Sequence, residues 1–229
     1  MSSRILVVSL FALFTASTVR EAAGVTADAL REPSLDAWLR AGYWALKLAV
    51  VAAFTFFLAV REPSRRPARE PVAFVACAGA IVSVVAIAPP TGQVPTALLL
   101  AGEGLALAAV AWLLVAVLAL GRCFGVLPEA RGLITRAPYR LVRHPVYLGE
   151  IAACAGLLLG AFSAWNVGCF VLLCAAQRVR IGLEERALEE AFPEYAAYAA
   201  RTPRLIPWTA PTPSTAYPTT PAQPASTSH

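Results

Sequence analysis

One stretch decides the fold of this 229-residue chain: Thr96–Leu120 reads TALLLAGEGLALAAVAWLLVAVLAL, with Glu103 as its single charged residue. As a helix, this stretch would be about 38 Å long at about 1.5 Å per residue. The hydrocarbon core of a bilayer is about 30 Å thick, and about 20 helical residues cross it. The stretch therefore predicts a transmembrane helix.

The composition extends this prediction to the rest of the chain. Hydrophobic residues make up 58% of the sequence and charged residues 14%, whereas soluble domains have about 45–50% and about 25%. Three further apolar runs are predicted to cross the membrane, at residues 5–19, 41–60 and 72–88. We therefore predict an all-α fold, a polytopic membrane helical bundle in which residues 1–120 carry the first four transmembrane helices.

The first of these runs has two interpretations. Residues 5–19 follow Arg4 and are short for a membrane span, which also fits a cleaved signal peptide. We favour a retained span because the rest of the chain is itself embedded in the membrane. Residues 20–40 carry mixed charges and Pro33, and they are predicted to form a loop.

Arginine marks one side of the membrane. Residues 61–70 contain four Arg and residues 121–146 contain five, whereas residues 89–95 carry no charge. The positive-inside rule therefore places the first two segments in the cytoplasm and the third outside. The excess of Arg over Lys and the abundance of Ala suggest a bacterial source, so we expect a multi-pass protein of the bacterial inner membrane.

A further apolar run, residues 151–176, has the small and polar residues 160–166 at its middle. A single tilted crossing would send the arginines that follow it to the outer side, against the positive-inside rule. We therefore predict a membrane hairpin over about residues 147–178, with both ends in the cytoplasm. From Ile181, apolar residues recur at the spacing of an amphipathic cytoplasmic helix. The Pro/Thr-rich residues 209–229 have the composition of a disordered tail.

Residue content argues against several functions. The five cysteines show no paired spacing of the zinc or redox type, and His144 is the one histidine besides the terminal His229, so no metal site is predicted. Asp28 and Asp36 lie far upstream of His144, which leaves no Ser-His-Asp arrangement. The arginines do not alternate with aromatic residues as they do on nucleic-acid-binding surfaces. No nucleic acid partner is therefore expected.

Polar residues concentrate in residues 121–208, the predicted catalytic region. Three pieces stand out: residues 136–150, which include Arg143-His144-Pro145, the pair Glu184-Glu185, and residues 201–208. Each piece alone has a plain structural explanation. The arginines and tyrosines could anchor the protein at the membrane interface, and the glutamates could form a solvated helix face. Together, however, they place a histidine, two glutamates and several arginines beside one hairpin.

At these residues the chain resembles the isoprenylcysteine carboxyl methyltransferase and phospholipid methyltransferase family of integral membrane enzymes. The resemblance covers about residues 120–208 and consists of two separated motifs in the family's order. It lies in Pro138-Tyr139-Arg140, Arg143-His144-Pro145, Tyr147, Gly149, Glu184-Glu185, Leu188, Phe192, Tyr195, Tyr198 and Pro203-Arg204. The chain departs from the family pattern at Ala137 and Pro193, where Gly is common.

The resemblance implies that the methyl donor is S-adenosylmethionine, bound at the cytoplasmic membrane surface. The implied cofactor-binding residues are Tyr139, Arg143, His144, Pro145, Tyr147, Leu148, Gly149 and Glu185. The resemblance also implies that Glu184 helps to close the cofactor pocket and that Arg204 lies near the reacting groups, which makes both catalytic candidates. A carboxylate acceptor needs no general base, but a thiol or an amine must lose a proton, which would give Glu184 or Glu185 the role of base.

The sequence thus predicts a membrane methyltransferase that acts on a lipophilic small molecule or lipid by in-line methyl transfer. The acceptor is expected to reach the site laterally between helices, from the surrounding membrane lipids. Its reactive group, whether a carboxylate, an amine or a thiol, stays open. Two alternatives also stay open, namely a non-catalytic membrane protein that keeps the fold and a transporter or transporter subunit.

Overall fold

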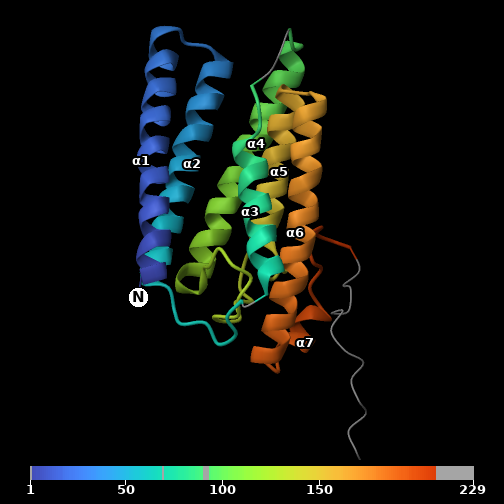
Figure 1. Ribbon diagram of the computed structural model, residues 1–229. Coiled ribbons are helices and arrows are strands. Elements are labelled where there is room, and N and C mark those ends of the chain that lie inside the picture. Colours follow the sequence, from blue (N-terminus) through green and yellow to red (C-terminus); the bar gives the residue numbers. More distant parts are fainter. Residues whose placement is uncertain (1, 69, 90–92, 210–229) are drawn as a thin grey trace, which may run out of the picture.

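The computed structural model describes residues 2–68, 70–89 and 93–209, and all but the first residue of the predicted tail at 209–229 lies outside these residues. The described residues form helices and no strand. The helices are α1 (Ser2–Arg31), α2 (Leu35–Val60), α3 (Pro71–Val85), α4 (Thr96–Leu120), the short 3-10 helix η1 (Gly121–Cys123), α5 (Pro145–Gly160), α6 (Ala164–Ala191) and α7 (Tyr195–Ala199). Figure 1 shows the long helices running side by side as a bundle. The predicted all-α fold is therefore confirmed.

Four helical stretches are long and apolar enough to cross a membrane, namely Val7–Arg31, Leu35–Val60, Thr96–Cys123 and Ala164–Ala191. The other two apolar helices, Pro71–Val85 and Pro145–Gly160, are shorter. Both short helices pack against α6, which is itself one of the long ones. The bundle therefore combines full-length spans with two shorter helices.

The prediction of a loop at residues 20–40 is wrong, because α1 continues to Arg31 and α2 begins at Leu35. Charge suggested the loop, yet residues 20–31 contain good helix formers such as Ala, Glu and Arg and no proline. The break falls at Pro33 and Ser34. The Ser34 side chain caps α2 by accepting a hydrogen bond from the backbone N–H of Ala37, 3.1 Å away.

The predicted membrane hairpin is present as α5 and α6, which residues 161–163 connect. Asn166 holds this turn, since its side-chain amide donates to the carbonyl of Ala161 at 2.6 Å and to that of Ala88 at 3.0 Å. The separate amphipathic helix from Ile181 is a wrong prediction. Residues 164–191 contain no proline, so α6 runs unbroken to Ala191. Glu184-Glu185 thus lies near the end of a long helix.

A close helix contact joins α4 to α5 through glycines. A Cβ atom added at Gly156 would lie 2.6 Å from the backbone nitrogen of Ala106 and 2.6 Å from the carbonyl oxygen of Gly102. Small residues at such a crossing let two membrane helices approach until their backbones touch. The two glycines therefore fix the position of α5, whose first residue begins the site described below.

This contact predicts a measurable loss of stability. In Gly156→Ala the added methyl group must push α4 and α5 apart, and overpacking of this kind destabilises by about 1–3 kcal/mol. Thermal unfolding in detergent, followed by tryptophan fluorescence, should show a lower Tm. The matched control is Gly168→Ala, because nothing lies within 4 Å of a Cβ at Gly168. Equal melting temperatures for the two variants would contradict the close packing.

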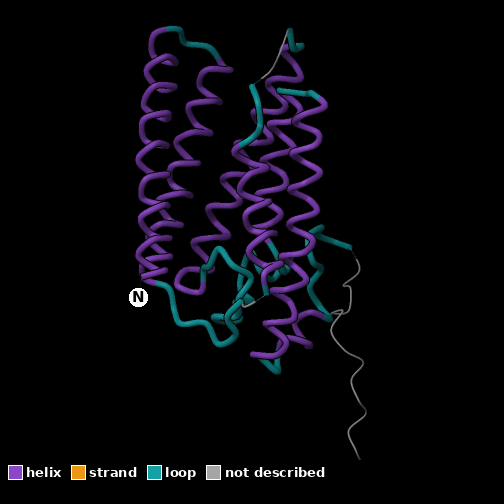
Figure 2. Tube along the Cα trace, in the orientation of Figure 1, coloured by secondary structure: helices purple, strands orange, loops and turns teal. Residues whose placement is uncertain are grey.

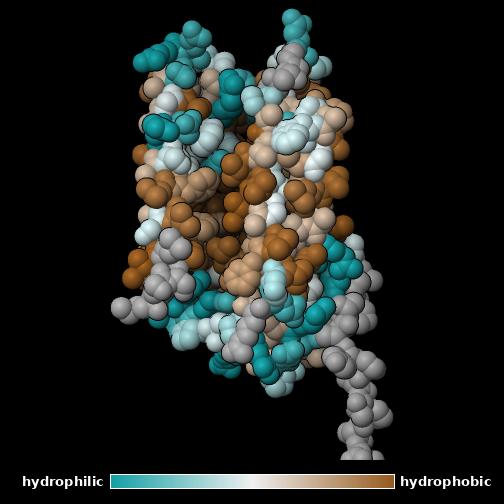
Figure 3. All heavy atoms as spheres, in the orientation of Figure 1, coloured by the Kyte–Doolittle hydropathy of each residue, from teal (hydrophilic) through white to brown (hydrophobic). Residues whose placement is uncertain are grey.

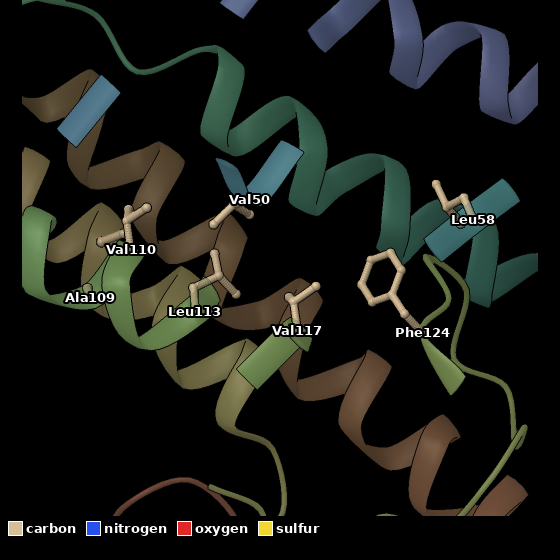
Figure 4. Packing of buried hydrophobic residues seen from close by; sticks show 8 residues of the cluster. Val50, Leu58, Ala109, Val110, Leu113, Val117 and Phe124 are labelled. Atoms are coloured by element: carbon tan, nitrogen blue, oxygen red, sulfur yellow. The ribbon is translucent and has the colours of Figure 1, made fainter. Parts of the chain in front are cut away.

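A hydrophobic core joins α2, α4 and α5. Its buried residues are Val50, Leu58, Ala109, Val110, Leu113, Val117, Phe124 and Ala153. Figure 4 shows Val110, Leu113 and Val117 along one side of α4, with Phe124 and Leu58 of α2 farther along the same cluster. The Phe124 ring stacks on the ring of Phe54, with the centroids 4.5 Å apart. This core anchors the loop that follows α4 to the helices.

Three connections gather at one end of the bundle, as Figure 2 shows in teal. They are the segment between α2 and α3, the segment between η1 and α5, and the chain that follows α6. A backbone hydrogen bond joins the first two, since the N–H of Arg65 donates to the carbonyl of Ala130 at 2.8 Å. The N–H of Glu62 donates to the carbonyl of Arg122 in η1, also at 2.8 Å. This end of the molecule carries the polar residues of the predicted catalytic region.

Candidate functional site

The site begins where the chain enters α5. Pro145 occupies the first turn of the helix, and His144 is the capping residue before it. The N–H groups of Arg143 and His144 donate to the carbonyls of Pro203 and Arg204 at 2.8 and 3.0 Å. The Trp112 indole of α4 donates to the carbonyl of Pro145 at 2.9 Å. The start of α5 is therefore fixed by both α4 and the C-terminal segment.

Glu185 is the centre of a buried ionic cluster. Its side chain is almost fully buried, and three basic side chains surround its carboxylate. Arg143 Nη1 and His144 Nε2 each lie 3.2 Å from Oε1, and Arg204 Nε donates to Oε2 at 2.9 Å. A buried carboxylate is stable only when it is paired in this way. The cluster therefore joins α6, the α5 entry and the C-terminal segment.

Glu184 points elsewhere, because successive residues on a helix are about 100° apart. Its Oε2 accepts a hydrogen bond from the Tyr147 hydroxyl at 2.5 Å. Both Glu184 and Tyr147 line a large internal cavity, whereas Glu185 and Arg204 do not. The two adjacent glutamates thus have different surroundings, one in a closed ionic cluster and one at a cavity wall.

A second polar network lies deeper in the hairpin, and the sequence interpretation missed it. Arg180 forms an ion pair with Glu150 at 3.5 Å and donates to Gln177 Oε1 at 2.9 Å. Gln177 in turn donates to Glu150. The guanidinium carbon of Arg180 lies 4.7 Å from the centroid of the Tyr147 ring, a cation–π contact. Polar residues inside a predicted span were the available signal, since such residues face cavities or partners.

Three buried tyrosines support the loops around this end. The Tyr198 hydroxyl donates to the carbonyl of Tyr139 at 2.6 Å, and the Tyr139 hydroxyl donates to the carbonyl of Ala116 at 3.4 Å. Burial raises the pKa of Tyr139 well above its usual value, and it also raises the pKa of Tyr195 and Tyr198. All three hydroxyls therefore stay protonated near neutral pH and can act as hydrogen-bond donors.

The cavity has a volume of about 470 Å³ and joins two different environments. At one end it is lined by polar side chains: Arg143, His144, Tyr147, Glu150, Arg180 and Glu184. Elsewhere its lining is largely apolar and includes Phe11 and Phe14 of α1, Val51 and Phe54 of α2, and Ile81 and Val84 of α3. Figure 3 shows a hollow between α2 and α3 whose visible walls are hydrophobic.

Six of the ten predicted site residues meet at the cavity, namely Tyr139, Arg143, His144, Pro145, Tyr147 and Glu184. Four do not line it: Leu148, Gly149, Glu185 and Arg204. Gly149 serves helix packing, since a Cβ there would lie 2.9 Å from the Leu113 Cβ of α4. Glu185 and Arg204 bind each other behind the cavity wall.

These observations define the architecture. It is an all-α membrane bundle whose helical hairpin places charged residues at one end of a lipophilic cavity. Residues 92–195 match the family described as phospholipid methyltransferase. This match confirms the predicted resemblance to that family of membrane methyltransferases over this part of the chain. The match begins before α4 and ends at Tyr195, so it includes Arg143, His144, Glu184 and Glu185 but leaves Arg204 outside.

The chain is also similar to the cobalt-zinc-cadmium resistance protein CzcN of Cupriavidus metallidurans. The two are 40% identical over 78 residues, which is 33% of this chain and 35% of the relative. The chain therefore matches about a third of the length of that curated relative. Among the described residues, no group of three or more His, Cys, Asp or Glu side chains is arranged to hold a metal ion.

Proposed function

We propose that the protein is an S-adenosylmethionine-dependent methyltransferase that methylates a lipophilic acceptor inside the membrane. The observation that carries the proposal is the cavity, which joins the Glu184–Tyr147 pair to an apolar wall within a region of methyltransferase family sequence. An enzyme that acts on a membrane-dissolved substrate needs both environments in one enclosed space. The acceptor enters laterally through the hydrophobic hollow between α2 and α3.

The polar end of the cavity fits the chemistry of this cofactor, which carries a carboxylate, an ammonium group and a sulfonium centre. Arg180 offers a buried Nε that has no hydrogen-bond partner among the described residues, a suitable donor to a carboxylate. Glu184 and Glu150 offer acceptors for an ammonium group or ribose hydroxyls. The Tyr147 ring offers an aromatic face for a cation. The first turn of α5 adds backbone N–H groups directed toward an anion.

The residues of the chain have separate tasks in this proposal. Bound S-adenosylmethionine supplies an electrophilic methyl group, and in-line transfer depends chiefly on positioning in a water-poor cavity. Tyr147 orients the Glu184 carboxylate. Glu184 takes the proton when the acceptor is an amine or a thiol and stays unchanged when it is a carboxylate. Glu185 and Arg204 are positioning residues, because they hold the α5 entry without lining the cavity.

The orientation follows from the charges at the two ends. The arginine-rich connections before α3 and before α5 share the polar end of the bundle. The positive-inside rule places such segments in the cytoplasm, where the soluble cofactor is made available. We therefore propose that the cofactor end faces the cytoplasm in the inner membrane of a bacterium.

Two measurements on the purified protein test the proposal. Titration calorimetry with S-adenosylhomocysteine should show saturable binding at one site. Incubation with methyl-labelled S-adenosylmethionine and a lipid extract should transfer label to a compound that partitions into organic solvent. Binding without transfer to any lipid, carboxylic acid or thiol would support a non-catalytic protein that keeps the fold. Absence of binding would overturn the proposed function.

A further inference from the structure

Lys47, the only lysine of the chain, lies in the middle of a membrane-spanning helix. It is separated from Leu35 and Val60, the ends of α2, by about 18 Å of helix on either side at about 1.5 Å per residue. Cationic groups at such depth are costly and mark functional positions when they face a cavity.

The ammonium group of Lys47 has aromatic neighbours. Nζ lies 4.2 Å from the Trp44 ring centroid and 5.9 Å from the Tyr43 ring centroid, both on its own helix. No described residue forms a hydrogen bond or an ion pair with it. Glu21 of α1, an exposed residue, acts on Lys47 electrostatically but from beyond ion-pair distance. The cation–π contacts hold the ammonium group in place without neutralising its charge.

Lys47 belongs to the wall of the same cavity as the proposed cofactor end. Tyr43 and Lys47 of α2 both line it, as does Cys154 of α5. Cys154 follows Tyr147 by seven residues, which is about 10 Å along the helix axis. The cavity therefore has a second polar point, separated from the first by apolar lining that includes Ala153 and Val50.

We propose that Lys47 binds an anionic group of the acceptor, such as a carboxylate, at a point of the cavity away from the group that is methylated. This inference rests on the proposed function and adds the class of substrate, a lipophilic acid whose reactive group lies away from its anionic group. The Tyr43 hydroxyl is a neighbouring hydrogen-bond donor for the same anion. In a medium of low dielectric constant, a fixed ammonium group discriminates strongly between an anion and its uncharged analogue.

The test compares an anionic probe with an uncharged one of the same chain length. Tritiated dodecanoate is bound to the purified protein in a neutral maltoside detergent at pH 8 and displaced by unlabelled dodecanoate or dodecanol. Wild-type protein should bind dodecanoate about tenfold more tightly than dodecanol. Lys47→Met should remove this preference, and Lys47→Arg should keep most of it. The matched control Arg178→Met removes an exposed cation of α6 that does not line the cavity, and it should change nothing.

Two further measurements separate this inference from other outcomes. S-adenosylhomocysteine binding and the Tm should be unchanged in Lys47→Met, because Lys47 lies away from the cofactor end. A Lys47→Met protein that loses both S-adenosylhomocysteine binding and thermal stability would overturn the inference. A Lys47→Met protein that still prefers dodecanoate to dodecanol would overturn it too. The Glu21→Gln variant should keep the preference for dodecanoate. Loss of that preference would also overturn the inference, because it would show that Lys47 acts through Glu21. Failure of wild-type protein to bind S-adenosylhomocysteine would overturn the proposed function and leave the anion preference as a separate result.

Discussion

Replacing Glu185 with alanine is expected to lower the free energy of unfolding by about 3–5 kcal/mol, because it removes the shared partner of a buried ionic cluster. Arg143 is almost fully buried and His144 is buried beside it. Without the carboxylate, both side chains and the Arg204 guanidinium would face one another with no anion between them. The backbone contacts of the α5 entry with residues 203 and 204 should loosen as a result.

Chemical or thermal unfolding in detergent measures this loss. The matched control is Glu190→Ala, since the Glu190 side chain is 59% exposed and its contact with Arg66 is an exposed ion pair at 3.5 Å. Such pairs contribute about 0–1 kcal/mol. The loss of unfolding free energy in Glu185→Gln should lie between the losses in Glu185→Ala and Glu190→Ala. The glutamine keeps the hydrogen bond to one partner but removes the charge. If Glu185→Ala and Glu190→Ala unfold alike, the cluster does not hold these three segments together.

Glu184→Gln is expected to weaken S-adenosylhomocysteine binding by at least tenfold with little change in Tm. The carboxylate lines the cavity, and a hydrogen bond to a charged group contributes about 1.5–3 kcal/mol, which corresponds to about ten- to a hundredfold in Kd. Because Glu184 is half-buried and stands outside the Glu185 cluster, the fold should tolerate the change. Calorimetry measures the Kd, and scanning calorimetry measures the Tm.

Tyr147→Phe should also weaken S-adenosylhomocysteine binding, but less than Glu184→Gln does. It removes the hydroxyl that orients Glu184 and keeps the aromatic ring. Glu194→Gln, an exposed change beyond the end of α6, serves as the control. A Glu184→Gln protein that binds the ligand like wild type would refute the assignment of Glu184 to the cofactor site. A Glu184→Gln protein that unfolds like Glu185→Ala would show that both glutamates serve the fold.

Much of the fold could be predicted from the sequence because the membrane imposes simple requirements on it. The bounds of α4 were predicted correctly from the apolar run Thr96–Leu120, and the charge of the segment after α6 predicted the α5–α6 hairpin. The same reliance on charge produced the errors. Charged residues end a membrane span but need not end a helix, so α1 continues to Arg31 and α6 to Ala191 beyond the runs that hydropathy marks.

The candidate site was only partly predictable, for a geometric reason. The motif Arg143-His144-Pro145 and the pair Glu184-Glu185 could be singled out in the sequence, but their division of roles could not. Which glutamate faces the cavity depends on the rotation of α6 against α5, and tight glycine packing of α5 on α4 fixes the position of α5. Arg180 escaped notice because an arginine near the end of a span usually serves as an anchor.

The C-terminal segment has a consequence for how the protein is made. Residues 203 and 204 contact the α5 entry and Glu185, so the ribosome delivers them after α1 to α7 have been synthesised. Until then the nascent bundle has an open polar end through which water can reach Glu185 and Arg143. Assembly of the site thus waits for the segment that follows α7, and it occurs at the cytoplasmic surface under the proposed orientation.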